Sequence, residues 1–343
     1  MRFKWKTTII IGIILIAFVA GLIYSIHLAS PVSLRTEKVT LEIPKHSGLK
    51  NIALELKRAG VIRNDKLFIL SVLLRGDKSR LKAGEYEFEP GDSLSQIIEK
   101  LVRGDVVIHK VTIPEGFTMN EIAELLERDG IMSKEAFLEK ARSSEFAREL
   151  LGDPSLTSLE GYLFPDSYSY KKGITPDELI RMMVARFKEV YVPLRAKAGE
   201  LDLTDREIVT LASIIEKETG NSYERPLVSA VFHNRLKLGM RLESDPTVIY
   251  GMSSFDGNLR KKDLKTETRY NTYVISGLPP GPISNPGRDS LEAALNPAQV
   301  NFLYFVSKGD GTHEFSSNYG DHRRAVNEYQ KGLSSNPNER KPQ

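Results

Sequence analysis

The chain has 343 residues, of which 41% are hydrophobic and 27% charged, so it can bury a sizeable core and is long enough for two or three domains. Its 48 basic and 45 acidic residues are interspersed and give a net charge of only +3, which argues against a nucleic-acid-binding surface. The absence of cysteine excludes disulfide frameworks, thiolate zinc sites and cysteine nucleophiles.

The N-terminus combines three basic residues, Arg2, Lys4 and Lys6, with an uncharged run from Thr7 to Ile26. Twenty residues at the helical rise span about 30 Å, the thickness of the hydrocarbon core of a bilayer. The positive-inside rule keeps the basic residues in the cytoplasm and places the rest of the chain outside. A cleaved signal peptide has a similar pattern, but this run is long and no small-x-small cleavage site follows it. We therefore expect an uncleaved transmembrane anchor over residues 7–29.

A pattern of short strand, proline-containing turn and amphipathic helix then occurs three times, beginning near Val39, Tyr86 and Val111. The second copy is partial. Ser93 and Thr118 are plausible N-caps for the helices of the last two copies. The arrangement resembles the LysM-type modules that bind N-acetylated glycans. Glycan binding and simple structural support remain open as roles for these units.

The segment Ser158–Tyr170 gathers four aromatic rings around Gly161 and Pro165, so we expect an irregular loop with exposed rings. One interpretation is a hydrophobic plug between domains. The other is a wall on which sugars stack, since aromatic faces match the apolar faces of pyranose rings. On the second interpretation Tyr162 would contact substrate.

A helix from about Asp205 to Thr219 is well specified, because Thr204 and Glu207 form a capping box and Gly220 can supply a left-handed exit. Glu216 and Glu218 fall on opposite shoulders of its apolar stripe, so only one of them can face a given cleft. The negative end of the helix dipole raises the pKa of carboxyl groups in the last turn, as a general acid requires. Glutamates at such positions are nevertheless usually solvated.

The chain after this helix is rich in polar groups and in turn formers. A cluster of six polar residues follows the next predicted helix: Arg241, Glu243, Ser244, Asp245, Thr247 and Tyr250. Four prolines and three glycines then fall between Gly277 and Gly287, and they predict a rigid loop that presents backbone donors to a substrate.

Four long motifs, LASIIEKET, RLESDPTVIYG, YNTYVISGLPPGPISNPG and LYFVSKGDGTHEFSSN, together resemble the YceG-like family of endolytic murein transglycosylases. LKAGEYEFEPG, EGYLFPDSY and the N-terminal anchor fit the same family. The resemblance implies a LysM-like domain, a catalytic domain outside the cytoplasmic membrane, and catalysis by the second glutamate of IIEKET, which is Glu218.

The resemblance also implies the chemistry. A protonated Glu218 would donate to the β-1,4 glycosidic oxygen between N-acetylmuramic acid and N-acetylglucosamine, and its carboxylate would then take the proton of the sugar's 6-hydroxyl. The product would be a 1,6-anhydromuramyl end, formed without water or a second carboxylate, unlike the products of two-carboxylate hydrolases. Such an enzyme would cut nascent strands and set glycan length beside the peptidoglycan synthases, which are candidate partners.

Several residues are candidates for substrate positioning or for support of the oxocarbenium ion, each with a structural role as the alternative: Asp245, Thr247, Tyr250, Asn271, Tyr162 and Glu216. Glu243 is a weaker candidate, because the family tolerates an uncharged amide there.

Metal and serine-hydrolase chemistry have little support. His233, His313 and His322 are scattered, no H-x-x-x-H or G-x-S-x-G occurs, and no metal or cofactor is expected. His313 falls in a predicted hairpin turn and is interpreted as a surface residue.

We therefore expect an α+β protein with a single N-terminal transmembrane helix, a small LysM-like β-α domain and a larger mixed α/β catalytic domain. It would be a single-pass protein of the cell (inner) membrane with a cytoplasmic N-terminus, acting on peptidoglycan glycan strands and not on nucleic acid. Two rivals remain: a muramidase that uses Glu218 with Asp245 as the second carboxylate, and a non-catalytic scaffold that binds glycan. The expected segments are a tail over 1–6, the anchor over 7–29, a connector over 30–38, the LysM-like domain over 39–107, the catalytic domain over 108–332 and a polar tail over 333–343.

Overall fold

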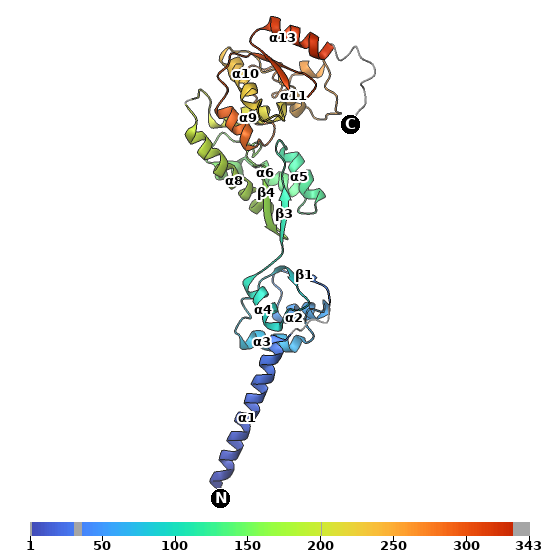
Figure 1. The fold of residues 1–343 in the computed structure, drawn as a ribbon, viewed down its shortest axis with the longest axis vertical. Helices are drawn as coiled ribbons and strands as arrows, with labels where there is room; N and C mark the ends of the chain where they lie inside the picture. Colours follow the sequence, from blue (N-terminus) through green and yellow to red (C-terminus); the bar gives the residue numbers. More distant parts are fainter. Residues whose placement is uncertain (1, 31–35, 200, 332–343) are drawn as a thin grey trace. The chain divides into compact units, whose positions relative to one another are not determined.

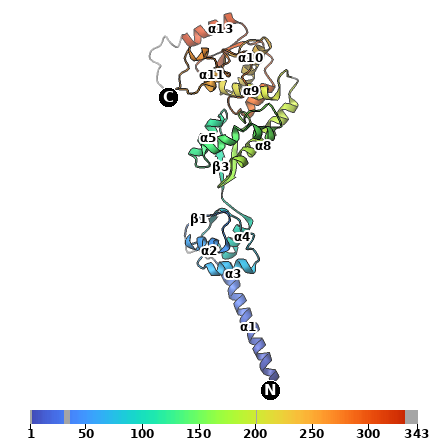
Figure 2. The same cartoon turned by 180° about the vertical axis from the view of Figure 1, so that it is seen from behind.

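The computed structural model describes residues 2–30, 36–199 and 201–331 (Figures 1 and 2). The predicted C-terminal tail and most of the predicted connector lie outside these residues. The fold is mixed α/β, and its contacts divide the chain into two compact units. Among the described residues, those up to 109 together with 169–172 form the first unit, and 110–168 together with those from 173 onward form the second.

The first unit begins with the long helix α1 (Arg2–Ala29). Its stretch Ile9–Ile26 is apolar and long enough to cross a membrane, and none of that stretch is buried inside the protein. This helix is compatible with the predicted single-pass anchor. Near its C-terminal end, Leu28 packs against the hydrophobic core of the same unit.

The rest of the first unit is built from two strands and three helices. The strands β1 and β2 pair antiparallel, with Val39 opposite Phe88 and Ile43 opposite Gly84. Side chains such as Leu56, Phe68, Tyr86 and Ile97 are fully buried in a core between the strands and the helices. The elements are β1 (Val39–Ile43), α2 (Leu49–Arg58), α3 (Asp65–Leu74), β2 (Gly84–Phe88) and α4 (Leu94–Arg103).

The ribbon of β3 (Ile108–Thr112) and β4 (Ser167–Lys171) is divided between the two units. The second unit also holds a small antiparallel hairpin, in which Tyr304 of β5 lies opposite Ser316 of β6. The elements of this unit, besides the shared ribbon, are α5 (Met119–Arg128), α6 (Lys134–Ala141), α7 (Ser144–Leu151), α8 (Pro176–Lys197), α9 (Asp205–Glu218), α10 (Arg225–Lys237), α11 (Asp245–Gly251), η1 (Asp263–Lys265), α12 (Arg288–Leu295), β5 (Tyr304–Ser307), β6 (His313–Ser316), α13 (Tyr319–Val326) and η2 (Asn327–Lys331).

The repeated strand–turn–helix pattern is confirmed, since α2, α4 and α5 each follow a short strand. Ser93 and Thr118 both form complete capping boxes at the starts of α4 and α5. Each box satisfies backbone N–H groups that would otherwise lack a partner in the first helical turn.

The expectation of exposed aromatic rings in Ser158–Tyr170 is wrong. Tyr162 and Phe164 are each 6% exposed and Tyr168 is 5% exposed, and Tyr162 packs edge-on against Phe187 of α8. Part of the segment is also a strand rather than a loop. A buried Tyr162 offers no ring face for a sugar, so the hydrophobic-plug interpretation fits better than the stacking wall.

Gly161 is needed for close packing in this segment. Its φ is +90°, and a Cβ there would collide with the ring of Pro282 and lie 3.0 Å from Val209 of α9. The absence of a side chain thus lets the Ser158–Tyr170 segment pack against α9 and the loop beside it.

We predict that Gly161→Ala destabilises the second unit by about 3 kcal/mol, because it adds a steric clash to the cost of a positive φ. Gly152→Ala is the matched control: its φ is +75° with nothing within 4 Å of the added Cβ, so about 1 kcal/mol is expected. Chemical denaturation of both variants measures the difference. Equal losses would show that the contact with Pro282 does not constrain the fold.

Candidate active site

The site is built around the last turn of α9. This helix begins as predicted, with a capping box between Thr204 and Glu207. The predicted left-handed exit at Gly220 is wrong: the helix stops at Glu218, and Thr219 is extended with φ −143°. The Thr219 hydroxyl accepts a hydrogen bond from the Asn221 amide at 3.0 Å, so a threonine side chain organises the exit in place of glycine.

Glu218 is partly buried at this end of α9 and has a strongly perturbed carboxyl group. Burial raises its pKa to about 7, and the nearby charge of Asp245 acts in the same direction. The hydroxyl of Ser244 donates to Glu218 Oε1 at 2.5 Å, and this bond and the charge of Arg235 oppose the rise. A carboxyl with this pKa is populated in both protonation states near neutrality, as acid/base catalysis requires.

Ser244 is itself held rigidly. Its amide donates to the Thr272 hydroxyl at 3.0 Å, and its carbonyl accepts from the Thr247 hydroxyl at 2.6 Å. The preceding residue, Glu243, adopts a left-handed φ of +53°, which is costly for a residue with a side chain. The segment that carries Ser244 is therefore fixed against the turn that contains Thr272.

Glu216 has a different environment from Glu218, because the two side chains leave α9 on opposite shoulders of its apolar stripe, as predicted. Its Oε1 is 3.3 Å from the buried guanidinium of Arg225, and its Oε2 accepts from the Gly287 amide at 2.9 Å. These partners engage both carboxylate oxygens and join α9 to the starts of α10 and α12. In the structure, Glu216 thus cross-links these three helices.

Asp245 and Tyr250, both in α11, face different partners. Asp245 is exposed, and its Oδ1 accepts from the Tyr273 hydroxyl at 2.7 Å. Tyr250 donates through its hydroxyl to Glu160 Oε2 at 3.0 Å, and its ring lies 4.8 Å from that of Tyr270. Of the two, Asp245 is the one whose charge reaches Glu218.

Thr247 and Asn271, which are predicted to position substrate, both have fully buried side chains, so any such role is indirect. The side-chain nitrogen Nδ2 of Asn271 donates to the carbonyl of Thr266 at 2.7 Å. Its side-chain oxygen Oδ1 accepts from the backbone amide of Tyr273 at 2.9 Å. Thr247 bonds to Ser244 and Thr272. These two residues shape the loops behind Ser244 and Tyr273.

Sequence reasoning missed Glu160, a second glutamate with a perturbed pKa. It is 4% exposed, and burial raises its pKa to about 7. It accepts from the Met119 amide at the start of α5, from Asn285 and from Tyr250. The sequence signal for Glu160 is the position of its carboxylate beside the apolar and aromatic residues of EGYLFPDSY.

The proline- and glycine-rich loop does not present its amides as predicted. The Ile283 amide donates to Ser213 of α9 at 3.0 Å, and the Asn285 amide donates to the carbonyl of Phe117 at 2.9 Å. With the bond from the Gly287 amide to Glu216, these donors are used inside the protein. The loop braces α9, and residues 281–287 are buried.

His313 lies in a hairpin, as predicted, but its side chain is largely buried instead of on the surface. It lies in β6, its side chain is 13% exposed, and its Nδ1 is 2.7 Å from Glu224 Oε2. The same carboxylate oxygen lies 3.5 Å from the hydroxyl of Thr219. Glu224 and His313 therefore support the chain exit directly after Glu218.

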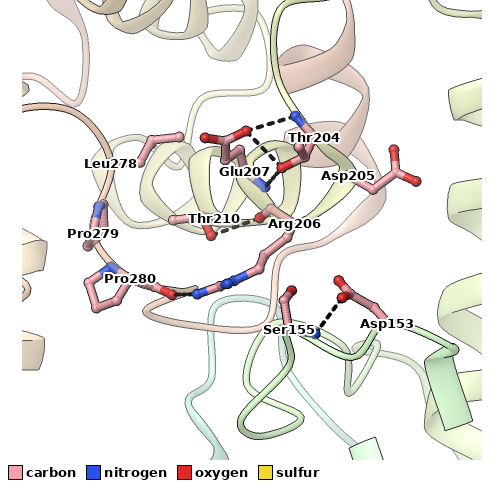
Figure 3. Close-up of a pocket in the computed structure, with 10 residues that line it drawn as sticks. All are labelled: Asp153, Ser155, Thr204, Asp205, Arg206, Glu207, Thr210, Leu278, Pro279 and Pro280. Carbon is pink, nitrogen blue, oxygen red and sulfur yellow. Dashed lines mark hydrogen bonds between the residues drawn. The ribbon is translucent and has the colours of Figure 1, made fainter. Parts of the chain in front are cut away.

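A cavity of about 500 Å³ lies at the opposite end of α9, around its N-terminal cap (Figure 3). Glu218 lies fourteen residues after the cap residue Thr204, which at the helical rise is about 20 Å along the helix. The bonds of the Thr204–Glu207 capping box and the bond from Arg206 to the Pro280 carbonyl occupy its walls. The cavity is thus remote from the Glu218 carboxyl. Elsewhere in the described part of the chain, no three His, Asp or Glu side chains form a cluster that could hold a metal ion.

Comparison with known proteins identifies clear relatives. Residues 41–328 match the model of the YceG-like family. A Bacillus subtilis protein named endolytic murein transglycosylase is 32% identical over 305 residues, which cover 85% of this chain and 84% of that protein. A Streptococcus pneumoniae protein of the same name is 30% identical over 340 residues, and the match spans only 62% of its length.

A solved structure is also similar. The crystal structure of a putative YceG-like protein from Listeria monocytogenes is 33% identical and superposes with a TM-score of 0.59. The match covers 84% of this chain and 99% of the Listeria chain.

We predict that Glu218→Gln stabilises the second unit in a pH-dependent way. The pKa of Glu218 rises from 4.5 to about 7 on folding, so the wild type loses stability as the pH rises through this window, whereas a glutamine does not titrate. The advantage of the variant should grow between pH 4.5 and 7 to about 1–3 kcal/mol and then stay constant. Denaturant unfolding at several pH values measures it, and a pH-independent difference would contradict the assigned environment.

Proposed function

Because the chain belongs to the YceG-like family, we propose that it is a lytic transglycosylase that cuts peptidoglycan glycan strands internally, with Glu218 as the acid/base carboxylate. Relatives that match over most of this chain carry the name endolytic murein transglycosylase, which supports the substrate class and the reaction. The proposal therefore combines family membership with the environment of one side chain.

The observation that carries the proposal is the perturbed carboxyl of Glu218. A pKa of about 7 keeps a large fraction of the group protonated at neutral pH, so it can donate to a glycosidic oxygen. The hydroxyl of Ser244, 2.5 Å away, then stabilises the carboxylate that forms when the proton leaves. Ser244 thus orients one oxygen of Glu218, and the other oxygen remains for the substrate.

In the proposed reaction, Glu218 donates its proton to the oxygen that joins C1 of N-acetylmuramic acid to C4 of N-acetylglucosamine. The C1–O bond breaks, and positive charge develops on the muramic acid ring. The 6-hydroxyl oxygen of the same ring attacks C1, while its proton passes to the Glu218 carboxylate. Glu218 ends protonated again, and the new end is a 1,6-anhydro sugar.

One carboxylate suffices for this sequence, because the sugar itself supplies the nucleophile. Asp245 is the candidate for the second carboxylate of a hydrolase, and its Oδ1 accepts from the Tyr273 hydroxyl at 2.7 Å. Its negative charge instead supports the raised pKa of Glu218 and would favour positive charge on a bound sugar ring. Asp245 and Tyr273 are therefore proposed to position substrate, and water is not needed.

We assign residues 39–107 to a LysM-like domain and residues 108–332 to the catalytic domain. The order β1, α2, α3, β2, with the two strands antiparallel, supports a LysM-like arrangement for the first of these. This domain would bind glycan or act as a spacer.

The helix α1 supports placement in the cell (inner) membrane as a single-pass protein, with the basic N-terminus in the cytoplasm and the catalytic domain outside. In that position the enzyme would meet nascent strands as the peptidoglycan synthases release them. We therefore propose that it sets glycan strand length beside those synthases.

We expect the purified full chain to release fragments with 1,6-anhydromuramyl ends from peptidoglycan, and Glu218→Gln to lose at least about 1,000-fold of this activity, because the variant keeps the shape but cannot transfer a proton. Mass spectrometry of the fragments measures both. Glu292→Gln, an exposed glutamate on α12, is the matched control and should retain wild-type activity. Reducing-end fragments would indicate a muramidase, and retained glycan binding without fragments from any protein would indicate a scaffold.

We predict that activity falls above about pH 7, as Glu218 loses its proton. Two variants should move this alkaline limb of the pH–activity profile in opposite directions. Ser244→Ala removes a bond that favours the carboxylate, so the limb should shift up by about one pH unit. Asp245→Asn removes a repelling charge, so the limb should shift down by a similar amount. The pH dependence of kcat/KM measures both shifts, and a common direction or a fixed limb would rule out Glu218 as the titrating acid.

A further inference from the structure

Helix α3 of the first unit has an apolar face that the described residues leave exposed. Phe68 and Val72 on one side of the helix are fully buried, but Leu70, Leu73 and Leu74 are 48%, 52% and 66% exposed. The three leucines follow the i, i+3, i+4 spacing, so they form one continuous stripe opposite the buried face. An ordinary surface helix would carry polar residues there.

The stretch of chain that carries this stripe is mostly basic, although Arg58 and Arg75 also pair with Glu55 and Glu99 outside it. Residues 57–80 contain seven lysines and arginines but only two acidic residues, Asp65 and Asp77. Asp65 is paired with Lys57 at 2.6 Å, and Asp77 accepts from both Arg75 and Arg80. Lys66 lies one helical turn before Leu70, on the same face. Apolar side chains framed by lysine and arginine are typical of helices that lie in the interface of a membrane.

The stripe lies close to the membrane anchor within the same unit. Leu28 near the end of α1 packs against the core to which Phe68 of α3 belongs, and α1 contacts α4. Arg75 at the end of α3 donates to Ser95 of α4 at 3.1 Å, which links α3 to the helix that touches the anchor. In both views α3 lies at the end of the unit where α1 joins it (Figures 1 and 2).

We propose that the leucine stripe of α3, formed by Leu70, Leu73 and Leu74, docks on the anionic lipid surface of the bilayer that α1 spans. The inference rests on the proposed anchoring by α1. Continuity with the anchor brings the leucines to the headgroup region, and the surrounding lysines and arginines attract anionic lipids. The first unit is then held on the membrane surface, with α1 and α3 as two points of attachment.

Site-directed spin labelling of the full chain in proteoliposomes tests this, because the sequence has no cysteine and each variant carries one label. Leu73→Cys reports on the stripe, and Thr40→Cys on exposed β1 is the control in the same unit. Ile16→Cys in the apolar stretch of α1 reports on the anchor separately. Collision rates with oxygen and with a water-soluble nickel chelate give the membrane depth of each label.

We expect the label at position 73 to show a severalfold higher ratio of oxygen to nickel collisions than the label at position 40, and a higher ratio in anionic than in zwitterionic vesicles. Equal ratios at 73 and 40, with a membrane-embedded label at 16, would overturn the docking and leave the anchor intact. A water-exposed label at 16 would overturn the anchor and the docking together. Spin–spin broadening at 73 that disappears on dilution with unlabelled protein would assign the stripe to a second copy of the chain and overturn the lipid proposal.

Discussion

The burial of α9 is the constraint on which the proposed chemistry depends. Eight consecutive residues of this helix, from Ile208 to Ile215, are buried on all sides by α10, α11, α12 and the proline-rich loop. A helix so enclosed carries its last turn into a poorly solvated environment, where Glu218 cannot recover the hydration that an ionised carboxylate needs. The single bond from Ser244 compensates only in part, so the proton is held more tightly than in water. The raised pKa that a proton donor needs near neutral pH thus follows from the packing of α9.

The same helix separates two glutamates that are only two residues apart. Glu216 meets a buried guanidinium and a backbone amide, which compensate its charge, and it becomes a cross-link between α9, α10 and α12. Glu218 meets one hydroxyl and a nearby negative charge, and these two partners do not compensate the charge of its carboxylate. Two carboxyl groups with the same chemistry therefore acquire different roles from their partners alone.

Local signals in the sequence predicted the parts of this arrangement that depend on neighbouring residues. The apolar run of α1, the N-caps Ser93 and Thr118, the capping box at Thr204, and the directions of Glu216 and Glu218 could all be derived within one helical segment. The role of Ser244 could not, because its contact with Glu218 joins positions 26 residues apart. For the same reason the sequence overestimated the exposure of Tyr162 and of the proline-rich loop: their burial depends on distant partners such as Phe187 and Ser213. The extended Thr219 replaced the expected turn at Gly220, because a threonine hydroxyl was available to accept the Asn221 amide.

The most direct test of the account is the ionisation of Glu218 itself, observed without substrate. The chain can be labelled with ¹³C at the glutamate carboxyl carbon, and the Glu218 resonance can be assigned as the one that is absent from Glu218→Gln. We expect this resonance to titrate near pH 7, well above the 4.5 of an unperturbed glutamate. A midpoint near 4.5 would mean that Glu218 is a carboxylate throughout the neutral range, and it would contradict its assignment as the proton donor.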